Sequence, residues 1–94
     1  MAIQLSEAAR ELLLEACQDP GGLILRLTAS GGSALLKTNG RIFGDGSPAE
    51  QTRWSSGIRQ LLRFGLVEAQ GDRGQIFCIT TEGYEAAYDL WGRK

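Results

Sequence analysis

Residues 47–84 constrain the fold more than any other part of the chain, because a helix with clear start and stop signals is followed there by strand patterns. Ser47 is a good N-cap, Pro48 suits the first helical position, and Glu50 completes the S-x-x-E capping box. Gly65 favours a helix C-terminus at this point, because glycine adopts the left-handed backbone conformation of a C-terminal cap without strain. The sequence therefore predicts a helix that begins after Ser47 and ends at Gly65.

The apolar residues of this segment recur at helical spacing. They form one stripe: Trp54, Ile58, Leu61 and Leu62. Polar residues occupy the opposite side: Thr52, Ser56, Arg59 and Arg63. We therefore expect the apolar stripe to lie beneath a β-ribbon and the guanidinium groups to face solvent.

Two strands and a last helix are predicted after this helix. The strand patterns cover Leu66–Ala69 and Gln75–Thr80, and the Gly-rich turn between them is typical of a hairpin. Thr80 or Thr81 is then placed to cap a helix over Thr81–Leu90.

The first half of the chain predicts a helix followed by three strands. Ser6 caps an amphipathic helix that runs to about Cys17. Leu23–Ala29 is a short aliphatic run, which favours a buried strand. Ala34–Thr38 and Arg41–Phe43 flank Asn39-Gly40, a strong signal for a type I′ hairpin turn. The predicted fold is α+β in the order α-β-β-β-α-β-β-α, a single domain over residues 1–94 with a small antiparallel sheet packed on three helices.

A set of residues in the second half resembles the winged helix-turn-helix domains of bacteria and archaea. The matching positions follow the pattern L-L-x-x-G-L-V-E, then F-x-I-T-x-x-G-Y-x-x-A: Leu61, Leu62, Gly65, Leu66, Val67, Glu68, Phe77, Ile79, Thr80, Gly83, Tyr84 and Ala87. The resemblance covers roughly the C-terminal half. A β-hairpin is predicted where members of that family have their second helix, so the chain departs from the pattern upstream.

The resemblance implies a DNA-binding module, with the central helix in the major groove and the hairpin on the backbone. It makes Arg53, Arg59 and Arg63 candidate DNA contacts, with Arg73 at the hairpin tip and Ser56 on the same helix. Residues 37–63 carry five basic and two acidic side chains, which adds Lys37 and Arg41. DNA binding predicts one exposed face for these cations, whereas the alternative is a set of solvated arginines on an amphipathic helix.

The last helix carries an aromatic stripe. Tyr84, Tyr88 and Trp91 fall at helical spacing, which suggests a self-association surface and a homodimer. The alternative is that Tyr84 packs on the core and the other two cover its edge. A protein-interaction or accessory domain on the same scaffold, without DNA binding, is accordingly the second functional reading.

The residue inventory argues against catalysis and metal binding. The 94 residues include no histidine, so a Ser or Cys nucleophile lacks its usual base. Cys17 and Cys78 have no metal-ligand spacing and read as small apolar residues, with a disulfide between them possible but unsupported. We expect no enzyme activity, no cofactor and no metal. With no long apolar run and no secretory signal, we expect a cytoplasmic protein without a membrane partner. The net charge of −1 argues against an overall electrostatic attraction to a polyanion.

Overall fold

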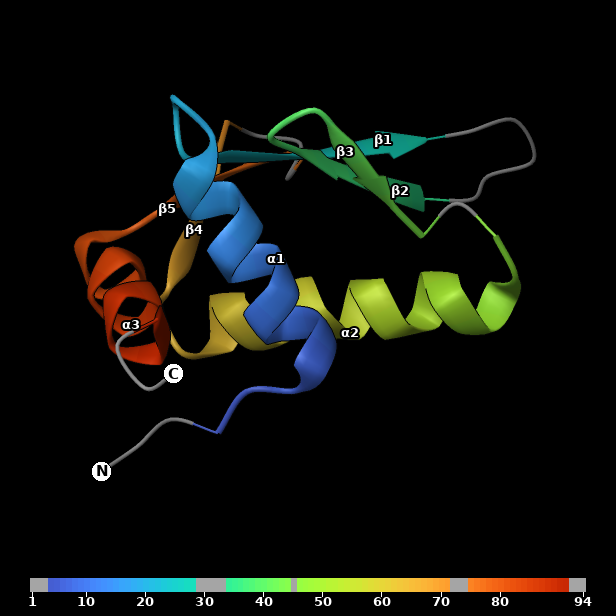
Figure 1. The fold of residues 1–94 in the computed structure, drawn as a ribbon. Coiled ribbons are helices and arrows are strands. Elements are labelled where there is room, and N and C mark those ends of the chain that lie inside the picture. The colour runs from blue at the N-terminus through green and yellow to red at the C-terminus, as the bar shows by residue number, and fades with distance from the viewer. Residues whose placement is uncertain (1–3, 29–33, 45, 72–74, 92–94) are drawn as a thin grey trace.

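The computed structural model describes residues 4–28, 34–44, 46–71 and 75–91, and it confirms the predicted α+β class and element order (Figure 1). The helices and strands have these bounds: α1 Glu7–Gln18, β1 Leu23–Thr28, β2 Ala34–Thr38, β3 Arg41–Phe43, α2 Pro48–Arg63, β4 Val67–Gln70, β5 Ile76–Ile79 and α3 Thr81–Trp91.

The five strands form one antiparallel sheet in the order β3-β2-β1-β5-β4. β1 is therefore the central strand, with the β2–β3 hairpin on one side and the β4–β5 hairpin on the other. Its Leu25 pairs with Lys37 of β2 and with Ile76 of β5. This register fixes which side chains share a face of the sheet, because neighbouring residues of a strand point to opposite faces.

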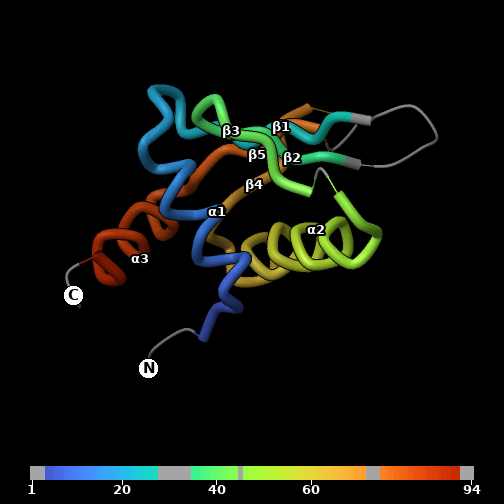
Figure 2. The backbone as a smooth tube through the Cα atoms, turned by 45° about the vertical axis from the view of Figure 1, so that its right-hand side comes forward, coloured from blue at the N-terminus to red at the C-terminus, as the bar shows by residue number. Residues whose placement is uncertain are grey.

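All three helices lie on the same side of the sheet, as both views of the backbone show (Figures 1 and 2). The strand residues on that side are buried against the helices: Ile24, Leu36, Thr38, Phe43, Val67, Phe77 and Ile79. They meet a helical layer in which Leu12, Leu13, Ile58 and Leu61 have no exposed surface. The core is thus a single layer between the helices and the inner face of the sheet.

Helix α2 begins and ends as its sequence predicts. The Ser47 side chain accepts a hydrogen bond from the Glu50 backbone N–H (3.3 Å). The second half of the expected capping box differs, because the Glu50 carboxylate accepts from Trp54 Nε1 instead (3.0 Å). At the other end Gly65 has φ +71°, and the N–H of Leu66 donates to the Leu61 carbonyl (2.9 Å), which closes a Schellman motif.

The first turn of α3 is packed directly on the end of α2. Thr80 caps α3 by accepting from the Gly83 N–H (3.0 Å), and its hydroxyl donates to the Gly65 carbonyl (2.7 Å). The Thr80 N–H donates to the Leu66 carbonyl (3.0 Å). Gly83 is buried against Leu66, with no room for a Cβ atom. This junction explains why the G-L and T-x-x-G parts of the sequence pattern occur together.

Cys17 makes the stability of the fold sensitive to alkaline pH. Burial raises the pKa of this thiol from 9.0 to about 11. The folded chain therefore keeps the proton at a pH where the unfolded chain has lost it. The stability that this proton supports is complete below pH 9.0 and is lost as pH rises toward about 11.

We expect the free energy of unfolding to fall over this range, and to fall less in Cys17→Ala. The measurement is urea unfolding under reducing conditions at several pH values. Burial also raises the pKa of Tyr84, and the Cys17 thiolate raises it further, so Cys17→Ala removes the contribution of Cys17 together with its effect on Tyr84. Parallel pH profiles for wild type and Cys17→Ala would contradict the assignment.

Candidate functional site

The face of the sheet turned away from the helices carries several exposed apolar side chains. We call it the outer sheet face. The strand register assigns ten side chains to it: Leu23, Leu25, Leu27, Leu35, Lys37, Ile42, Glu68, Gln70, Ile76 and Cys78. Within the described residues, no helix packs on this face.

The central strand makes the outer sheet face aliphatic. Leu23 and Leu27 are 37% and 38% exposed, Ile76 on the neighbouring strand β5 reaches 41%, and Ile42 on the edge strand β3 reaches 52%. The prediction of a buried strand at Leu23–Ala29 is therefore wrong for the outer face of Leu23–Thr28, and Ala29 lies outside the described residues. A run of leucines and isoleucines normally indicates burial on both faces. Here three helices cover one face and the other remains open.

Two opposite charges lie at opposite sides of this apolar surface. Lys37 on β2 lies between Leu25 and Ile42 in the register, whereas Glu68 lies on the edge strand β4 beside Cys78. Both side chains belong to exposed residues. In the described part of the chain neither forms an ion pair. The Glu68 carboxylate accepts a hydrogen bond from the Gln70 side chain (3.4 Å), and both charged groups remain exposed on the face.

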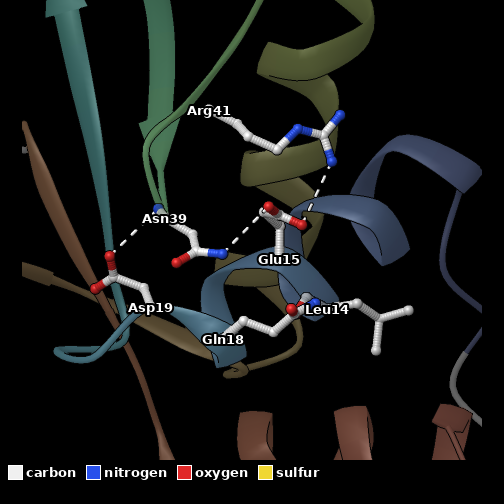
Figure 3. Close-up of polar contacts among 6 residues, drawn as sticks. All are labelled: Leu14, Glu15, Gln18, Asp19, Asn39 and Arg41. Carbon is white, nitrogen blue, oxygen red and sulfur yellow. Dashed lines mark hydrogen bonds and ion pairs between the residues drawn. The ribbon is translucent and has the colours of Figure 1, made fainter.

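Arg41 is used within the fold. Its guanidinium forms an ion pair with Glu15 of α1 (3.4 Å) and lies 4.9 Å from the centre of the Phe43 ring (Figure 3). Glu15 also accepts from the Asn39 side chain (3.3 Å), and Asp19 accepts from the Asn39 backbone N–H (3.2 Å). This group of contacts fastens the β2–β3 turn to the end of α1. Arg41 is therefore not a free cation.

A second candidate surface is the polar side of α2. Arg59, Arg63 and Ser56 border a shallow hollow of about 580 Å³, which Gln60, Leu62 and Phe64 complete. Arg59 and Arg63 are exposed, and among the described residues neither has an acidic partner. The expectation that Trp54, Ile58 and Leu61 are buried beneath the sheet is confirmed.

The structure does not gather all the predicted DNA contacts on one face. Arg53 forms an ion pair with Glu50 (3.6 Å) and lies over the Trp54 ring, outside the hollow. Lys37 projects from the outer sheet face, opposite the side covered by α2, which corrects the expectation that it joins the arginines. The reason is register, since the neighbours of Lys37, Leu36 and Thr38, are the buried residues of β2. Arg73 lies outside the described residues.

The aromatic side chains of α3 differ in their surroundings. Tyr84 packs against Gly22, where an added Cβ would collide with the tyrosine hydroxyl. Tyr88 is 81% exposed, and Trp91 is also exposed. Tyr84 thus has a structural role in the fold, and Tyr88 and Trp91 remain a predicted self-association surface.

The outer sheet face is the part of the site that the sequence analysis missed. Its signal is present in the strand alternation: once one side of β1 is assigned to the core, Leu23, Leu25 and Leu27 all fall on the other side. The number of predicted helices was also too small to cover both faces of five strands.

The described ranges hold no group of three or more His, Cys, Asp or Glu side chains placed to bind a metal ion. Their helices are too short or too polar to cross a lipid bilayer. The two thiols are free: Cys17 packs partly against the core from α1, and Cys78 lies on the outer sheet face.

Comparison of the chain with protein-family models, with curated proteins and with solved structures gives no match. The functional interpretation therefore depends on the geometry of these two surfaces.

Proposed function

We propose that this chain is a protein-interaction module that binds its partner through the outer sheet face. The observation that supports this is the exposure of Leu23, Leu27, Ile42 and Ile76 on one surface. An antiparallel sheet with a solvated face normally alternates apolar and polar residues along its strands. The central strand instead presents only leucine on its outer side, at Leu23, Leu25 and Leu27.

The size of the outer sheet face agrees with a binding role. The five strands have six, five, three, four and four residues, which at the usual rise and spacing give a footprint of roughly 350 Å². The face also carries Lys37, Glu68 and Gln70, and the largest apolar patch on a typical monomer is of similar size and is often functional. Covering the four exposed side chains removes apolar area from water, and each square ångström contributes about 25 cal/mol.

Site-specific photo-crosslinking in cells tests this function. A photoreactive amino acid is placed at Leu27 or Ile42 on the outer sheet face, and at Glu11 on the exposed side of α1 as the matched control. We expect protein crosslinks from the first two positions and few from the third. Equal crosslinking from all three positions, or none from the sheet, would contradict the proposal.

Duplex DNA is a second candidate ligand, on the polar side of α2. The observation that favours it is the pair Arg59 and Arg63 beside the hollow, both exposed and without an acidic partner among the described residues. Guanidinium groups bind phosphate through planar paired hydrogen bonds. In this arrangement α2 enters the groove, as the resemblance to winged helix-turn-helix domains implies.

Fluorescence anisotropy with random duplex DNA at low and moderate salt tests the second candidate. A contact with two to four phosphates predicts a slope of about −2 to −4 for log affinity against log salt concentration. The double variant Arg59→Glu/Arg63→Glu is expected to lose binding. Lys37→Glu makes the same type of charge change on the opposite side of the molecule and is expected to weaken binding much less. Equal losses in both variants would show that α2 does not make the contact.

A further inference from the structure

We infer that the partner of the outer sheet face is a second copy of this chain, packed face to face about a two-fold axis parallel to β1. This inference rests on the proposed function and names the partner of the same surface. Most soluble oligomers are symmetric homodimers in which the same patch meets itself. Packed sheets align their strands to within about 30° and lie about 10 Å apart.

The position of β1 suits such an axis. It is the third of five strands, so a two-fold rotation about its direction places β1 over β1 and exchanges the two sides of the sheet. Leu23, Leu25 and Leu27 then pack against the same leucines of the partner. Ile76 of β5 comes to lie over Lys37 on β2 of the partner, because both residues pair with Leu25, and Ile42 on β3 of the partner lies beside that lysine.

The positions of the charges on the outer sheet face favour this axis. Lys37 lies one strand to one side of β1, and Glu68 lies two strands to the other side. The rotation places Lys37 of each copy over β5 of the partner, one strand from Glu68 on β4, with the two Cα atoms roughly 13 Å apart. Extended lysine and glutamate side chains together span that distance. Two such ion pairs form in each dimer.

The other aligned arrangement is unfavourable when its axis is centred on the middle of β1. A two-fold axis perpendicular to the strands places β2 over β2, and centring it on Leu25 sets Lys37 against the same lysine of the partner. Like charges across an interface disfavour association. An uncharged apolar partner is also a poor fit, because it would cover the Lys37 amine without a compensating carboxylate. A second copy supplies both the leucines and the carboxylate.

Charge and area set the expected strength. The net charge of −1 gives little repulsion between copies. A footprint of roughly 350 Å² on each copy lies in the range of weak, transient interfaces. We therefore expect a weak dimer, with a dissociation constant in the micromolar range or higher.

Sedimentation equilibrium of the purified chain tests the inference, from about 10 μM to about 1 mM protein, a range that brackets a weak interface. The variants Lys37→Glu and Glu68→Lys each place like charges opposite one another. Each is expected to raise the dimer dissociation constant by about tenfold or more, because two pairs reverse per dimer. Circular dichroism confirms that each variant is folded.

Mixing the two variants gives the decisive outcome. The Lys37→Glu chain carries a carboxylate at both positions, and the Glu68→Lys chain carries an amine at both, so every facing pair in the mixed dimer joins opposite charges. We therefore expect the mixture to dimerise, and the double variant Lys37→Glu/Glu68→Lys to dimerise alone. The matched control Tyr88→Ala/Trp91→Ala changes α3 and is expected to leave dimerisation unchanged.

Three results would overturn the inference: a monomer at about 1 mM, a dimer that the single charge reversals do not weaken or that mixing does not restore, and a dimer lost in the α3 variant. The photo-crosslinking separates this inference from the proposed function. Crosslinks from Leu27 and Ile42 to other proteins, with a chain that stays monomeric, would reject the homodimer and support the interaction module.

Discussion

Gly83→Ala is expected to lower the free energy of unfolding by about 3 kcal/mol or more, because an added Cβ collides with the backbone of Leu66. The carbonyl oxygen of Leu66 also accepts the Thr80 N–H at 3.0 Å, so it cannot move away without loss of that bond. Alanine is the better helix former by about 1 kcal/mol, and the collision exceeds this gain. The melting temperature should fall by more than about 10 °C for a chain of this size.

Gly46→Ala is the matched control for this substitution. Gly46 precedes the cap of α2, and a Cβ there meets only the Glu50 side chain at 3.9 Å. We expect the free energy of unfolding to change by less than about 1 kcal/mol. An increase is expected rather than a decrease, because alanine restricts the unfolded chain more than glycine does. The check is thermal and urea unfolding of both variants by circular dichroism. If Gly83→Ala proves as stable as Gly46→Ala, α3 does not pack on the end of α2 as described.

Phe77→Ala is expected to be the second severe change, with a loss of about 3–5 kcal/mol in unfolding free energy. Phe77 lies on the inner face of β5 and is 2% exposed. It is the largest of the fully buried side chains among the described residues. Its removal leaves a cavity between the sheet and the helices. Arg26, whose guanidinium lies 5.2 Å from the ring centre, also loses its contact.

Ile76 provides the control for which face of β5 is buried. Ile76 belongs to the same strand but lies on the outer sheet face and is 41% exposed. Ile76→Ala should cost less than about 1 kcal/mol when urea unfolding is measured at low protein concentration, where copies are separate. Equal losses for the two substitutions would mean that both faces of the sheet are covered.

The local elements of the fold could be predicted because their signals lie in short segments. Ser47 caps α2, and Gly65 ends it with a positive φ, as expected. Asn39 and Gly40 adopt φ values of 51° and 79°, which the predicted type I′ turn requires. In each case the controlling residues are within a few positions of the structure that they determine.

The arrangement of the sheet could not be predicted in the same way. The central place of β1 depends on its pairing with β5, more than fifty residues away. The same long-range pairing, together with the side chosen by the helices, decides that Lys37 and Leu27 face away from α2. A run of leucines predicts that a strand can be buried. It does not predict which face of the strand packs against the core.

The resemblance to winged helix-turn-helix domains stays a prediction. The β4–β5 hairpin follows α2 and precedes α3 in the expected order. Between β1 and α2, however, the chain forms the β2–β3 hairpin, where members of that family have a helix. That hairpin widens the sheet and enlarges the outer sheet face. The larger face favours the hypothesis of a protein-interaction module over that of a DNA-binding module.

The alkylation rate of Cys78 tests most directly whether two copies of the chain associate through the outer sheet face. This native thiol lies on that face beside Leu23 and Glu68. The measurement uses the Cys17→Ala background and excess iodoacetamide, with protein from about 10 μM to about 1 mM. If copies meet through this face, the rate constant falls as the concentration of the protein rises. A rate constant that stays the same over the whole range would contradict the claim.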